Sequence, residues 1–117
     1  MYKALFLSPM IPSFEIRETA VFFEEVLCFS SVMNTEDYAI FQKDGLTIHI
    51  LKAGQDIGEM EFYLEVDNLE EIWEAAKDKT KGLKVKEPFN QKYGMREMHI
   101  VIPQTKTLLF IGQGLKS

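Results

Sequence analysis

Residues 38–52, YAIFQKDGLTIHILK, carry the clearest structural signal of the chain. Two short runs of apolar, aromatic and β-branched residues stand on either side of Asp44-Gly45. Glycine adopts a positive φ at little cost, so an Asp-Gly pair between two such runs is typical of a tight hairpin turn. The pattern predicts two antiparallel strands, over 38–43 and 46–52.

The residues before this hairpin predict two more strands and a helix. Residues 3–10 form a short apolar run ended by prolines, and a further strand is expected at 30–34. Between them, a helix over about 14–27 with Ser13 as its N-cap is predicted, because apolar residues recur there at helical spacing. These residues are Ile16, Ala20, Phe23 and Leu27. The first module, about 1–53, therefore has the order βαβββ.

The same order repeats after a polar, glycine-bearing connection. Residues 59–66 alternate apolar with polar side chains, as a half-exposed strand does. Asp67 and Glu70 resemble a capping box, which predicts a helix at about 68–79 with Leu69, Ile72, Trp73 and Ala76 on its buried side. Three strands follow, at about 84–90, 96–102 and 107–112. A shift of 60 residues lays the second module, 59–114, over the first, and places Leu109 on His49.

Length and composition limit the classes of function. A chain of 117 residues suits one domain, and a formal charge of −5 argues against a nucleic-acid partner. We expect no membrane span, because no apolar run approaches the roughly 20 residues that a bilayer requires. The single cysteine, Cys28, excludes an internal disulfide and agrees with a reducing compartment. The expected location is the cytoplasm.

Three stretches resemble motifs of one protein superfamily. Residues 22–29, FFEEVLCF, resemble the F-Y-x-x-x-L-G-F helix end of the vicinal-oxygen-chelate superfamily of glyoxalases, dioxygenases and bleomycin-resistance proteins. Residues 93–98, YGMREM, are similar to the W-G-x-R-E-F stretch of the bleomycin-resistance branch, and 65–69 resemble the opening of the second helix. Cys28 stands where the family usually has glycine, and 102–106 keep only the proline of the usual D-P-D-G-N turn.

The resemblance implies an α+β fold, in which two βαβββ modules form curved mixed sheets around a pocket with the helices outside. It also implies a homodimer with an exchanged strand and cavities at the interface. Metal enzymes of the superfamily place ligands at the positions of Ser8, His49, Glu61 and Leu109, where strand alignment allows Phe110 instead of Leu109. Leucine cannot bind a metal and serine is a poor ligand, so we expect no resident metal or other cofactor, with His49 and Glu61 as weak candidates.

The resemblance also suggests which residues contact a ligand. We predict that Ser8, His49, Glu61, Tyr63 and Leu109 bind a small organic molecule, as in a bleomycin-resistance-like protein that sequesters an antibiotic. The ligand would be aromatic or cationic. The alternative function is a metal-dependent lyase, isomerase or dioxygenase, and no catalytic residue can be named from the sequence.

Several polar residues have a structural interpretation beside the functional one. His49 on a strand surface, Glu61 as an exposed residue and Tyr63 in the core are open alternatives to their ligand-binding functions. We interpret His99 as structural and expect Arg96 and Glu97 to form a local charge pair. Trp73 is expected to pack against the sheet.

Overall fold

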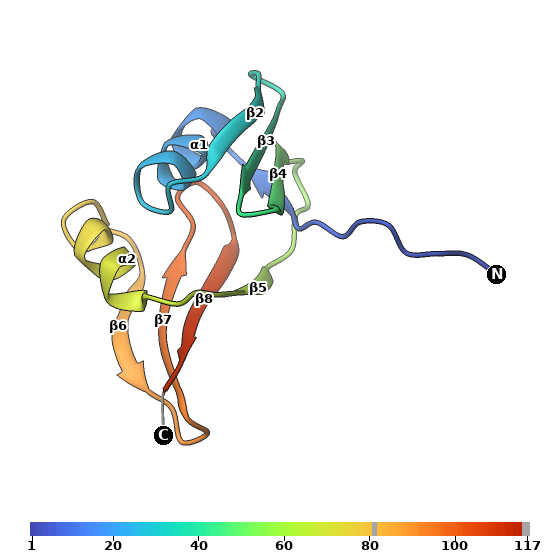
Figure 1. Cartoon of the computed structure of the whole chain (residues 1–117). Helices are drawn as coiled ribbons and strands as arrows, with labels where there is room; N and C mark the ends of the chain where they lie inside the picture. The colour runs from blue at the N-terminus through green and yellow to red at the C-terminus, as the bar shows by residue number, and fades with distance from the viewer. Residues whose placement is uncertain (81, 116–117) are drawn as a thin grey trace.

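The computed structural model describes residues 1–80 and 82–115. Within this part, the chain forms two four-stranded sheets, each packed against one helix (Figure 1). The first sheet has the strand order β1-β4-β3-β2, and the second repeats it as β5-β8-β7-β6. In both sheets the pairing of the first two strands in this order is parallel and the others are antiparallel. The expected α+β fold of two βαβββ modules is confirmed.

The first module contains the predicted hairpin with the predicted bounds. Asp44 and Gly45 have φ angles of 50° and 81°, the left-handed values that a tight turn of this kind requires. The antiparallel register runs from Tyr38 opposite Leu51 to Lys43 opposite Leu46. The elements of the module are β1 (Met10–Ser13), α1 (Ile16–Glu25), β2 (Ser30–Asn34), β3 (Tyr38–Lys43) and β4 (Leu46–Lys52).

The first strand and the first helix begin later than the sequence predicts. Hydrogen bonding requires a partner strand, and β4 pairs with Met10–Ser13, so the prediction of a strand at 3–10 was wrong for most of its length. Pro12 lies inside this strand, which is possible because β1 is at the edge of its sheet. Ser13 precedes α1 by more than one residue, and its hydroxyl accepts the N–H of Glu15 at 3.1 Å.

The second module follows the prediction closely, with a different helix cap. Asn68, rather than Asp67, is the N-cap of α2, and its side chain accepts the N–H of Glu71 at 3.3 Å. The predicted cap was therefore wrong by one residue. The elements are β5 (Met60–Glu65), α2 (Leu69–Ala76), β6 (Val85–Asn90), β7 (Met95–Val101) and β8 (Thr107–Gly114). No helix in the described ranges is long and apolar enough to cross a membrane.

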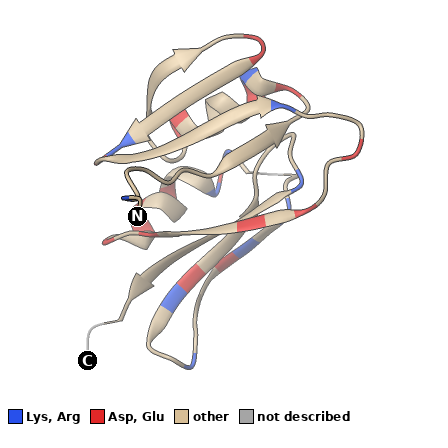
Figure 2. Ribbon diagram, turned by 90° about the vertical axis from the view of Figure 1, so that its right-hand side faces the viewer, with Lys and Arg blue, Asp and Glu red and all other residues tan. Residues whose placement is uncertain are grey.

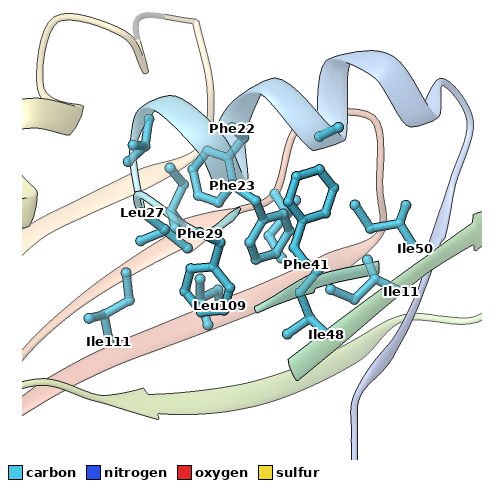
Figure 3. Packing of buried hydrophobic residues seen from close by; sticks show 14 of the residues in the cluster. Ile11, Phe22, Phe23, Leu27, Phe29, Phe41, Ile48, Ile50, Leu109 and Ile111 are labelled. Carbon is cyan, nitrogen blue, oxygen red and sulfur yellow. The ribbon is translucent and has the colours of Figure 1, made fainter. Parts of the chain in front are cut away.

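One cluster of buried apolar side chains joins the two sheets. Figure 3 shows Phe22 and Phe23 of α1 above Phe41 of the first sheet, with Leu109 and Ile111 of β8 in the same cluster. The phenylalanine rings meet edge to face or stacked at 5.4 to 6.4 Å between centroids. The predicted apolar stripes of both helices contribute to this core, and the stripe of α2 includes Trp73, which packs against it as expected. Because one side of each sheet is used for this core, the other side is available for a site.

Candidate functional site

Each sheet has one face that packs against its helix and one that does not. On the first sheet Phe41, Ile48 and Ile50 are buried toward α1, so the alternate residues lie on the opposite side. We call that side the first open face, and it carries Met10, Tyr38, Ile40 and His49. The second open face is the corresponding side of the second sheet, and it carries Glu61, Tyr63, Glu65, Phe89, Glu97, His99 and Phe110.

The first open face centres on His49. The hydroxyl of Tyr38 lies 2.6 Å from Nδ1 of His49, and the two rings meet edge to face. The ring of Phe6 lies 6.2 Å from the imidazole, between centroids. Ser8, a predicted ligand contact, donates its hydroxyl to the carbonyl oxygen of Thr47 at 2.8 Å. The face therefore offers an imidazole oriented by a phenol, and the hydroxyl hydrogen of Ser8 is already used by the backbone.

The second open face contains a carboxylate with three hydrogen-bond donors around it. Glu97 is only 5% exposed. It accepts hydrogen bonds from the hydroxyl of Tyr93 at 2.7 Å and the amide of Gln91 at 3.1 Å, and Nε2 of His99 lies 3.2 Å away. Burial alone would raise the pKa of Glu97, but these three bonds outweigh it, and the pKa lies below the ordinary value of 4.5. The site therefore holds a fixed negative charge at neutral pH.

Aromatic rings lie on both sides of His99, the histidine that contacts this carboxylate. His99 lies between Phe110, at 4.3 Å between ring centroids, and Phe89, at 5.2 Å. Nζ of Lys86 lies 4.1 Å from the centre of the Phe89 ring, a cation–π contact. A cluster of aromatic rings next to a carboxylate suits an aromatic ligand that bears hydrogen-bond donors.

Tyr63 stands on β5 at the boundary of this face. Its hydroxyl donates to Oε1 of Glu65 at 3.0 Å, and the residue is 47% exposed. Partial burial, the hydrogen bond to Glu65 and the nearby carboxylates raise the pKa of Tyr63 to about 12. The phenol is therefore neutral across the physiological range.

A mainly apolar cleft of about 340 Å³ connects Tyr63 with the first sheet. Tyr63 and Leu109, two of the predicted ligand contacts, both line it. The other lining side chains include Phe6, Leu7, Leu46 and Phe62. A volume of this size is at the lower end of the range for small-molecule sites.

The structure divides the predicted residues between two sheets. His49 belongs to the first sheet, and Ser8 precedes β1 and is hydrogen-bonded to Thr47 of that sheet, whereas Glu61 and Tyr63 lie on the second open face. Leu109 is 0% exposed and faces the core, so the open-face position beside Tyr63 is taken by Phe110, which the strand alignment also allowed.

The expected charge pair between Arg96 and Glu97 does not form, so this prediction was wrong. Arg96 and Glu97 are adjacent in a strand, so their side chains point to opposite faces of the sheet. Figure 2 shows basic and acidic residues close together along the second sheet. Arg96 binds Glu70 of α2 at 2.6 Å, whereas Glu97 lies on the open face. Sequence reasoning missed Glu97 and assigned His99 a structural role. Glu97 and His99 are two residues apart on one strand, and this spacing alone predicts that both side chains lie on the same face of the sheet.

The residues of one chain do not fit a divalent metal. His49 and Glu61, the two candidate ligands, lie on different sheets. Among residues 1–80 and 82–115, no three His, Cys, Asp or Glu side chains lie together as a metal ion requires.

Solved structures share this architecture over the whole chain. A bleomycin resistance determinant encoded on the transposon Tn5 superposes with a TM-score of 0.76 at 24% identity, covering 95% of this chain and 98% of its own. The chain has the glyoxalase/bleomycin-resistance fold. A bleomycin-binding protein from Streptomyces verticillus, complexed with copper(II)-bleomycin, gives 0.73 at 17% identity over 100% of both chains. Lactoylglutathione lyase from Agrobacterium tumefaciens gives 0.74 at 12% identity, covering 97% and 96%.

Comparisons of sequence are less informative. No protein-family model matches the chain, and no curated protein matches it. The fold neighbours include both bleomycin-binding proteins and a lyase, so the fold alone does not distinguish ligand binding from catalysis.

Proposed function

We propose that this chain is a small-molecule-binding protein of the bleomycin-resistance type, which acts in the cytoplasm and sequesters an aromatic or cationic compound such as an antibiotic. The observation that carries the proposal is the second open face, where the fixed charge of Glu97 lies beside the rings of His99 and Phe110. Bleomycin-binding proteins among the fold neighbours support this class of ligand.

We further propose that the protein acts as a homodimer. Residues 1–7 are exposed, and the N-terminal end of this segment extends away from the body of the molecule (Figure 1). Leu5 and Leu7 are 89% and 95% exposed, which is costly for two large apolar side chains in water. A second copy would cover this segment and the open faces, as strand exchange between subunits would do.

The binding proposal is tested by calorimetry and native mass spectrometry with metal-free bleomycin, copper(II)-bleomycin and a panel of aromatic amines. We expect at least one compound to bind each subunit and to raise the melting temperature by mass action. Phe110→Ala should weaken that binding at least about tenfold, since it removes a stacking surface. Phe14→Ala, at an exposed aromatic residue outside both open faces, is the matched control and should bind normally. A protein that binds none of these compounds would overturn the proposal.

A further inference from the structure

Gly112 and Tyr63 are packed against each other in a way that requires a glycine. Gly112 lies on β8, opposite Glu65 of β5. A Cβ atom at position 112 would lie 2.5 Å from the Tyr63 hydroxyl oxygen and 2.8 Å from Cε1 of its ring. The backbone of Gly112 is outside the left-handed region, so its conformation alone would accept any residue. The glycine is needed because the Tyr63 ring occupies the space of a side chain.

The position of the ring determines which hydrogen-bonding groups Tyr63 presents. Its hydroxyl hydrogen is donated to Glu65, so the phenol oxygen offers only lone pairs to another molecule. The hydroxyl of Tyr93 is likewise donated to a carboxylate, that of Glu97. The polar side-chain groups of Tyr63, Glu65, Tyr93 and Glu97 are therefore hydrogen-bond acceptors toward a ligand.

We propose that Gly112 is a positioning residue of the ligand site, which seats Tyr63 over β8 so that its oxygen accepts a hydrogen bond and selects ligands that carry N–H or O–H donors beside an aromatic ring. This inference rests on the proposed function, because it concerns the same open face. The proposed specificity depends on three residues of this chain: Gly112, Tyr63 and Glu65.

The first test requires no ligand. Tyr63 is identified in the NMR spectrum of protein with ¹³C-labelled tyrosine by comparison with Tyr63→Phe. At pH 11, a phenol with a pKa of about 12 is about one tenth ionised, whereas a free phenol is about nine tenths ionised. We expect Gly112→Ala to displace the ring and increase the ionised fraction several-fold. Gly114→Ala, on the same strand, is the matched control, because a Cβ atom at position 114 would meet nothing within 4 Å.

The second test measures selectivity with two probes that differ by one donor, indole and 1-methylindole. We expect the wild-type protein to bind indole at least about fivefold more tightly, and Gly112→Ala to lose this ratio while Gly114→Ala keeps it. In a Tyr63→Ala background, Gly112→Ala should change nothing further. If Gly112→Ala does not fold by circular dichroism, Tyr63→Phe tests the acceptor role, and it should also lose the ratio.

The outcomes separate this inference from the proposed function. Unchanged ionisation of Tyr63 in Gly112→Ala overturns the positioning role, whatever ligands bind. Equal affinity of the wild-type protein for the two indoles overturns the selectivity, even if bleomycin or another compound binds. Displacement of the ring in a protein that binds no compound shows that Gly112 seats Tyr63, and it refutes the proposed function together with the selectivity.

Discussion

Replacing Leu109 and Phe110 in turn by alanine tests which side of β8 is the core and which is the site. Leu109 is 0% exposed within the cluster that joins the sheets, whereas Phe110 is half-buried on the second open face beside His99. Removal of a fully buried leucine side chain costs about 3 kcal/mol, since both its burial and its packing are lost. The entropy of unfolding of a domain of this size is about 0.25 kcal/mol per kelvin, so Leu109→Ala should lower the Tm by about 12 °C.

Phe110→Ala should cost about half as much, or about 6 °C, because water already reaches part of the ring. The two variants are compared by thermal unfolding followed by circular dichroism, at equal protein concentration so that any dimerisation affects both equally. Ligand affinity should show the opposite order, with the larger loss in Phe110→Ala. If Phe110→Ala is the less stable variant, or if Leu109→Ala alone loses binding, the assignment of the faces of β8 is wrong.

Three further predictions concern other parts of the molecule. Cys28 has a φ of 58°, so Cys28→Gly should remove backbone strain and raise the stability by about 0.5–1 kcal/mol in urea unfolding; a loss of stability would contradict this. Because the pKa of Glu97 is lowered by folding, its contribution is present above pH 4.5 and is lost as the pH falls through the folded value. Glu97→Gln should therefore cost about 1–2 kcal/mol at pH 7 and flatten the stability curve on the acid side of pH 4.5, and an unchanged slope would refute this. Deletion of residues 2–7 should convert the proposed dimer to a monomer in native mass spectrometry, and a dimer that persists would show that the interface lies elsewhere.

The fold was predictable where local chemistry and the global pairing agree. The strands around Asp44-Gly45 have the predicted bounds, because the turn brings the two runs together and sets their register. The first strand was misplaced because residues 3–8 have a strand-like sequence, while only the partner strand decides which residues pair. The cap of α2 was shifted for a similar reason, since Asp67 and Asn68 are both good caps and tertiary packing selects between them.

The candidate site was less predictable because it depends on which face each residue occupies. A shift of 60 residues preserves the register of the hairpins, since the pair Phe41–Ile48 falls on the pair Val101–Leu108, but it exchanges the buried and open faces. The buried pair of the second hairpin is Ile100 with Leu109, and the chain between these two residues is two residues longer than between Phe41 and Ile48. This difference moves Leu109 into the core and places Phe110 where His49 lies in the first module.

The two modules keep the same buried face and differ on the open one. Ile48 and Ile50 of β4 are matched on β8 by Leu109 and Ile111, and all four are apolar and buried. On the open side, His49 is matched by Phe110, and the histidine of the second sheet lies on β7 instead. The fold depends on the buried half of each strand, so this half can resemble distant proteins while the open half changes freely. His49 is paired with a phenol and His99 with a carboxylate, so only the second of these two histidines lies beside a fixed negative charge.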